Sequence, residues 1–143
     1  MNVDQILLLK GRNVVSIEAD RSLGEAARLL SERRIGAVVV VDGRQPVSGI
    51  LSERDIVRAI AAQGARALDE PVSRFMTGEV VTCTCLHSVN ELMELMTQQK
   101  FRHVPVVEGG QLVGIISIGD VVKQHVEAVE AESQAIKEYI ATA

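Results

Sequence analysis

The stretch Gly49-Ile50-Leu51-Ser52-Glu53-Arg54-Asp55 decides the fold, because Gly114-Ile115-Ile116-Ser117-Ile118-Gly119-Asp120 repeats its Gly-Ile-x-Ser-x-x-Asp pattern. Working outward, an offset of 66 residues lays the Val-rich run 37–41 on residues 103–107. A slip of one residue near Ser48 changes the offset to 65 for the motif itself. Two copies with so long a period indicate a pseudo-symmetric pair rather than a solenoid.

Each copy predicts the order strand, helix, strand, strand, helix. Ser22-x-x-Glu25 and Ser88-x-x-Glu91 are capping boxes that begin the first helix of each copy. Near-continuous β-branched runs are typical of strands buried on both faces. The predicted strands are 14–17, 37–41 and 47–51 in the first copy, and 80–83, 104–107 and 112–116 in the second.

These elements predict an α+β fold, an α/β sandwich of two repeats related by a pseudo-twofold axis. Two helices leave one face of each sheet bare, so we expect the repeats to pack sheet to sheet with two equivalent clefts between them. We expect the first repeat to span residues 1–62, a linker 63–70, the second repeat 71–126 and a C-terminal helix 127–143.

The repeated motif has two interpretations. Ser and Asp three residues apart form a capping box that complements the helix dipole, and this alone explains one copy. A strand that leads into a helix N-terminus also offers amide and hydroxyl groups to a phosphate. A carboxylate one turn into the helix can accept hydrogen bonds from a ribose diol. The recurrence of the motif favours the binding interpretation.

With these motifs and Arg102-His103-Val104-Pro105-Val106-Val107, the chain resembles a tandem cystathionine-β-synthase (CBS) domain pair, also called a Bateman module, over about residues 3–125. The resemblance implies a stand-alone regulatory protein that binds AMP, ADP, ATP, NAD(H) or, less expected, S-adenosylmethionine between its repeats. It implies one site from Ser52, Arg54, Asp55, Thr82, Arg102 and His103, and another from Ser117, Asp120, Ser16, Gly36, Ala37 and Val38.

The two implied sites differ in charge. Gly36-Ala37 stands in the first copy where the second has Arg102-His103, and Gly119 stands where the first has Arg54. All the extra cations therefore favour the Asp55 site, which we expect to bind a phosphate-bearing ligand more tightly. We expect the Asp120 site to be weaker, empty or suited to a less charged ligand. Lys10 and Arg12 either reach a phosphate or are simply exposed, and Lys100 is expected in solvent at a helix end.

Composition excludes several classes of protein. The 143 residues are too few for a (β/α)₈ barrel, which typically needs ~250. A net charge of −4, with two Phe, one Tyr and no Trp, disfavours a nucleic-acid partner. No apolar run approaches the ~20 residues of a membrane helix, and the N-terminus lacks the basic region of a signal peptide. The sequence predicts a cytoplasmic protein.

No nucleotide-hydrolase, dehydrogenase, zinc-protease or serine-hydrolase motif occurs, so a non-catalytic protein is expected. We expect a regulator that binds an adenine nucleotide, senses cellular energy and signals to an unidentified protein. The alternative is a scaffold with vestigial clefts that acts through its C-terminal helix. A redox or metal sensor using Cys83 and Cys85 is a weaker third possibility, because the cysteine spacing fits no common metal site.

The C-terminal segment has its own pattern. Val122, Val126, Val129, Ile136 and Ile140 follow the spacing of a coiled-coil seam that is interrupted at Ser133. The seam either packs on its own domain or docks on another chain. Because Bateman modules commonly pair into disc-like dimers, the resemblance implies a homodimer.

Overall fold

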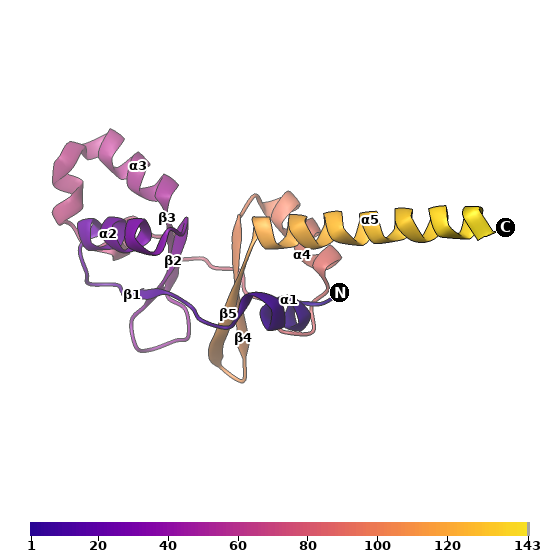
Figure 1. Ribbon diagram of the computed structural model, residues 1–143. Helices are drawn as coiled ribbons and strands as arrows, with labels where there is room; N and C mark the ends of the chain where they lie inside the picture. The colour runs from indigo at the N-terminus through magenta and orange to yellow at the C-terminus, as the bar shows by residue number, and fades with distance from the viewer. Residues whose placement is uncertain (143) are drawn as a thin grey trace.

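The computed structural model describes residues 1–142 and brings the strands of both repeats to the middle, with helices at either end (Figure 1). The first repeat contains β1 (Ser16–Glu18), α2 (Leu23–Arg33), β2 (Ala37–Val41), β3 (Gly49–Ser52) and α3 (Glu53–Gln63). The second contains α4 (Val89–Gln99), β4 (His103–Glu108), β5 (Gln111–Ser117) and α5 (Ile118–Thr142). The predicted α+β class is confirmed.

The first strand of the second repeat is shorter than predicted. In the first repeat, β1 pairs parallel with β2, and the Val39 amide donates to the carbonyl of Val15 over 3.2 Å. The residue equivalent to Val39 is Pro105, which has no amide hydrogen to donate. The expected strand 80–83 is therefore reduced to a single parallel bridge between Cys83 and Val106.

Backbone details repeat with the sequence offset. Arg34 and Lys100, 66 residues apart, end α2 and α4 in the left-handed conformation, with φ of 55° and 61°. The first amide of α3 donates to the carbonyl of Gly36, and the first amide of α5 donates to that of Arg102. The pseudo-symmetry read from the sequence therefore extends to caps and tertiary hydrogen bonds.

Each repeat is completed by the segment that precedes the other repeat. Helix α1 (Val3–Lys10) buries Val3, Ile6 and Leu7 in the core of the second repeat. The 3-10 helices η1 (Gly64–Asp69) and η2 (Val72–Arg74) bury Ala67 and Val72 in the core of the first. The expected ranges 1–62 and 71–126 therefore each contain a segment that packs in the other repeat, and the expected linker 63–70 is helical and partly buried.

Two glycines allow α1 and the η2 segment to lie close to the sheets. A Cβ on Gly114 would lie 2.6 Å from a methyl group of Leu7, and one on Gly49 would lie 2.5 Å from the sulfur of Met76. Side chains at these two positions would force α1 and the η2 segment away from the sheets.

The second helix of the second repeat continues without a break into the C-terminal segment. Helix α5 runs from Ile118 to Thr142 and projects from the body of the protein (Figure 1). The expected C-terminal helix is thus the outer part of α5, and its last residue, Ala143, lies outside the described residues. Within residues 1–142, no helix is both long and apolar enough to cross a bilayer.

Candidate functional site

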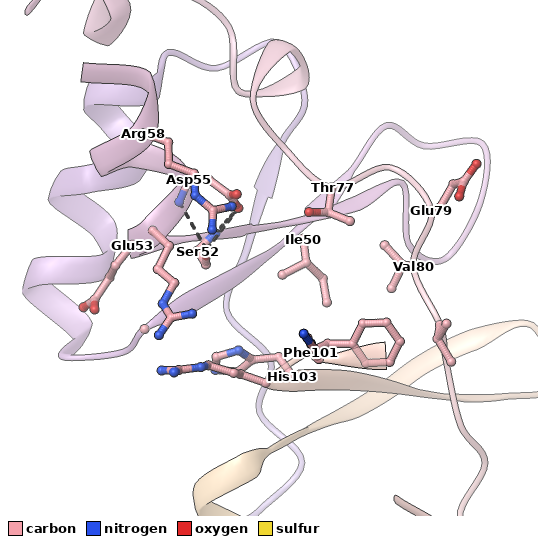
Figure 2. Close-up of a pocket in the computed structure, with 15 residues that line it drawn as sticks. Ile50, Ser52, Glu53, Asp55, Arg58, Thr77, Glu79, Val80, Phe101 and His103 are labelled. Atoms are coloured by element: carbon pink, nitrogen blue, oxygen red, sulfur yellow. Dashed lines mark hydrogen bonds between the residues drawn. The ribbon is translucent and has the colours of Figure 1, made fainter. Parts of the chain in front are cut away.

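A cavity of about 310 Å³ lies between the two repeats. It opens where β3 leads into α3, opposite the start of β4, and Figure 2 shows side chains of both repeats lining it. The segment that joins the repeats forms a third wall. The lining residues divide into first-repeat residues Gly36, Ile50, Ser52, Glu53, Arg54, Asp55 and Arg58, connecting residues Thr77, Glu79, Val80 and Val81, and second-repeat residues Lys100, Phe101, Arg102 and His103.

Asp55 is held in a fixed orientation by Ser52. One carboxylate oxygen, Oδ2, accepts hydrogen bonds from the Ser52 amide over 2.8 Å and from its hydroxyl over 3.1 Å. The Ser52 hydroxyl accepts in turn from the Asp55 amide over 3.3 Å. The predicted capping box is therefore present, and it restricts the carboxylate while the group still lines the cavity.

Five basic side chains line the same cavity as this carboxylate. Arg54 and Arg58 come from one face of α3, because residues four apart are neighbours on a helix. Lys100, Arg102 and His103 approach from the second repeat. The acidic residues of the lining are Asp55, Glu53 and Glu79. Even with His103 neutral, the four Arg and Lys side chains outnumber the three carboxylates, so the cavity lining has a net positive charge although the whole chain has a net charge of −4.

His103 is shifted toward its neutral form. Burial lowers the pKa of His103 most, and the charges of Lys10 and Arg102 lower it further. Asp120 and Glu53 oppose these effects without reversing them. The imidazole is therefore predominantly neutral at pH 7, and an anion bound beside it would raise its pKa again.

The structure brings together most of the residues expected at the Asp55 site. Ser52, Arg54, Asp55, Arg102 and His103 all line the cavity, but the sixth expected residue, Thr82, does not. The connecting segment lines the cavity with Thr77, Glu79, Val80 and Val81. These residues all precede the expected Thr82 in the chain.

Sequence reasoning missed two cations of this site. Arg58 follows Arg54 by one helical turn, a spacing that could have identified it. Lys100, expected in solvent at a helix end, lines the cavity because its left-handed φ ends α4 and turns the chain into the site.

The second implied grouping is arranged differently. Ser117 and Asp120 form the same box, with the Ser117 amide 2.8 Å and its hydroxyl 3.0 Å from Asp120 Oδ2. Lys10 at the end of α1 donates to the same oxygen over 2.6 Å, and to the carbonyl of Ile115 over 2.9 Å. Burial alone would raise the pKa of Asp120, but the bonds from Lys10 and Ser117 outweigh it and lower the pKa.

The remaining residues of that grouping lie elsewhere. Gly36 lines the Asp55 cavity, and Ser16 lines a separate open groove beside α2. Ala37 and Val38 are buried in the strand β2. The Asp120 carboxylate is thus neutralised by a side chain of this chain, whereas the Asp55 carboxylate faces a cationic cavity.

Comparison with known proteins agrees with this architecture. Residues 9–62 and 72–127 each match the CBS domain. The chain belongs to the CBS domain family. This CBS pair is 52% identical to the CBS-domain containing protein ATU1752 from Agrobacterium tumefaciens, with a TM-score of 0.84 over 87% of this chain and 99% of that one.

The CBS pair is also similar to two further proteins. It is 35% identical to the mitochondrial CBS domain-containing protein CBSX3 of Arabidopsis thaliana over 85% of its own length, and it spans 61% of that protein. It is 25% identical to the CBS domain pair of protein MJ0100, with a TM-score of 0.77 over 87% of this chain and 99% of that one. That structure is a complex with 5′-methylthioadenosine and S-adenosyl-L-methionine.

Both cysteines of the CBS pair are free thiols. Cys83 is buried in the core of the second repeat, and burial raises its pKa to about 12, with smaller contributions from Cys85 and Glu108. Burial also raises the pKa of Cys85, although Arg12 opposes the effect. Thiols of this kind are poor nucleophiles at neutral pH. Among residues 1–142, no group of three or more His, Cys, Asp or Glu side chains is placed to hold a metal ion.

Proposed function

We propose that this CBS pair is a regulatory module that binds an adenine nucleotide in the cavity between its repeats. The observation that carries the proposal is that five basic side chains from both repeats line the same cavity as the Asp55 carboxylate. A carboxylate restrained by a capping box suits a ribose diol, and the surrounding cations suit phosphate.

Each part of a nucleotide has a matching part of the lining. We assign the ribose to Asp55, and the phosphates to Arg54, Arg58 and Arg102, whose guanidinium groups can form charge-assisted bidentate bonds. The apolar lining residues Ile50, Val80, Val81 and Phe101 supply contacts for the adenine ring.

The charge of the cavity lining favours some of the candidate ligands over others. The MJ0100 complex shows that a protein of this fold binds adenosine derivatives without phosphate. The Asp55 cavity has more basic than acidic side chains, so electrostatic complementarity favours AMP, ADP, ATP or NAD(H) over the sulfonium cation of S-adenosylmethionine. AMP and ATP competing for one such site would make the protein a sensor of cellular energy.

The location of the cavity suggests how binding is transmitted. A ligand that contacts both repeats stabilises the relative arrangement that binds it best, by its difference in affinity between arrangements. A regulated partner that contacts both repeats would sense this change.

A thermal-shift panel tests the proposal. AMP, ADP, ATP, NAD and S-adenosylmethionine are compared with adenosine and inorganic phosphate. A ligand present at 100 times its Kd stabilises the folded state by about 2.7 kcal/mol, which raises the Tm by several degrees for a domain of this size. We expect the phosphorylated adenine ligands to give the largest shifts. No shift with any of them would overturn the proposal and favour the scaffold alternative.

A further inference from the structure

The Asp120 carboxylate is held by the same geometry as the Asp55 carboxylate. The Ser117 amide and hydroxyl lie 2.8 and 3.0 Å from Asp120 Oδ2. The corresponding distances from Ser52 to Asp55 Oδ2 are 2.8 and 3.1 Å. The two carboxylates are therefore prepared alike, and what lies against each of them decides what it can bind.

At Asp120 that neighbour is the ammonium group of Lys10. Its Nζ lies 2.6 Å from Asp120 Oδ2 and donates to the carbonyl of Ile115 over 2.9 Å. The first-repeat equivalents of these two acceptor residues, 65 positions earlier, are Ile50 and Asp55, and both line the open cavity. Lys10 therefore fills the space in the second repeat that corresponds to part of the cavity in the first.

Helix α1 brings Lys10 to this position. In the first repeat, the edge of β3 pairs with the connecting segment, because Ile50 and Thr77 exchange backbone hydrogen bonds of 3.0 and 2.9 Å. In the second repeat, the segment that packs in the equivalent place is helical as far as Lys10, and the lysine side chain bonds the edge of β5. The lysine thus takes the place that a backbone bridge has in the first repeat.

The rest of α1 keeps the lysine in this place. Val3, Ile6 and Leu7 are buried in the core of the second repeat. Leu7, one helical turn before Lys10, also packs closely against Gly114 on β5. Because a tethered group of this kind competes at an effective concentration on the order of millimolar, a free nucleoside displaces it poorly.

We propose that Lys10 closes the Asp120 box and so limits the chain to one bound nucleotide, in the Asp55 cavity. This inference rests on the proposed function, which assigns the cavity to that nucleotide. A nucleoside could enter the Asp120 box only by breaking two charge-assisted hydrogen bonds and by filling space that Lys10 occupies. Lys10 is therefore a specificity-determining residue that acts by exclusion.

The vacated box would suit a neutral nucleoside. With the lysine removed, the Asp120 carboxylate keeps the bonds of its capping box and is free to accept from a ribose hydroxyl. The Arg102-His103 pair of the cavity corresponds, at the offset of 66, to Gly36-Ala37, whose side chains have no charge. Because these positions supply no cation for a phosphate, adenosine is the matching probe.

Binding stoichiometry tests the proposal. Equilibrium dialysis with saturating AMP, followed by adenosine, counts the ligands of both kinds that are bound to each chain. We expect a total of one for wild type and two for Lys10→Ala. Lys10→Arg is the matched control and should bind one, because it keeps a cation with donors for both oxygens. Lys10→Ala/Asp120→Ala should also return to one, which would locate the second ligand at the box.

The opposite results are equally clear. A total of two for wild type, or of one for folded Lys10→Ala, would overturn the proposal. Lys10→Ser is a second variant that vacates the box, and retained AMP binding shows that either variant is folded. Failure of the proposed function is distinct, because wild type would then bind no AMP. In that case adenosine alone is the probe: Lys10→Ala should still bind one more adenosine than wild type, and equal numbers would overturn the inference.

Discussion

Replacing Asp55 by Ala should remove most of the affinity of this CBS pair for AMP. Oδ2 of Asp55 is engaged by the Ser52 amide and hydroxyl, at 2.8 and 3.1 Å. We therefore assign Oδ1 to the ligand, as an acceptor for a ribose hydroxyl. The variant deletes this acceptor and the negative charge that strengthens its bond.

The size of the loss follows from the bond that is removed. A hydrogen bond to a charged group contributes about 1.5–3 kcal/mol. At about 1.4 kcal/mol for each tenfold change, the Kd for AMP should rise roughly 10- to 150-fold. The variant also loses a capping residue, which costs about 1 kcal/mol of folding stability, so binding must be measured well below its Tm.

Asp120→Ala is the matched control, and isothermal titration calorimetry with AMP is the assay. This variant deletes the same box from the other repeat, together with the 2.6 Å contact to Lys10. It therefore destabilises the fold at least as much but leaves the Asp55 cavity intact. We expect its Kd to remain within about threefold of wild type, a change of less than 1 kcal/mol. Equal losses in both variants, or no loss in Asp55→Ala, would refute the reasoning.

Three further predictions concern stability and pH. Lys10→Met should lower the free energy of unfolding at pH 7 by about 0.5–1 kcal/mol, since it removes a partly buried ion pair. Because the folded-state pKa of Asp120 is lowered, this stabilisation is present above its unfolded value near 3.9 and is lost as the pH falls through the folded pKa. Urea unfolding should therefore show a larger difference at pH 7 than at pH 2.5, and an equal difference at both would contradict the assignment. AMP binding should be accompanied by proton uptake at pH 6–7, because phosphate raises the lowered pKa of His103; calorimetry in buffers of different ionisation enthalpy should detect it, and uptake that persists in His103→Gln would assign it to another group. Gly49→Ala should destabilise the fold by about 1–3 kcal/mol, because its Cβ would lie 2.5 Å from a side-chain sulfur, whereas Gly78→Ala, with nothing within 4 Å, should change the unfolding midpoint little.

Local sequence signals predicted most of the secondary structure. Serines followed three residues later by Glu or Asp marked the starts of four helices, and Ser22, Ser52 and Ser88 cap α2, α3 and α4 as expected. The β-branched run 37–41 coincides with β2. These signals were readable because a cap or a buried strand depends on residues close together in the chain.

Packing between segments distant in the chain could not be predicted as well from the sequence. The sequence did not show that Val3, which precedes the first repeat, packs in the core of the second, or that Val72 packs in the core of the first. The shortened strand at Cys83 depended on the missing amide of Pro105, which lies on a different strand. Both features result from pairings between distant segments, which local periodicity does not encode.

The candidate site was predicted in part for the same reason. Asp55, Arg54 and Arg102 were identified from the repeat and the resemblance, and all three line one cavity. Lys100 was missed because its role depends on how α4 ends. The contact of Lys10 with Asp120 was missed because it joins residues 110 positions apart.

Calorimetric titration of AMP and adenosine into wild type and Arg54→Ala tests the central claim most directly. The account predicts one tight AMP site per chain, weaker binding of adenosine, and a loss of about 1.5–3 kcal/mol for AMP in Arg54→Ala with little change for adenosine. This pattern would show that the phosphate of the ligand contacts the cationic cavity between the repeats. Equal affinity of wild type for AMP and adenosine, or no binding of either, would contradict the account.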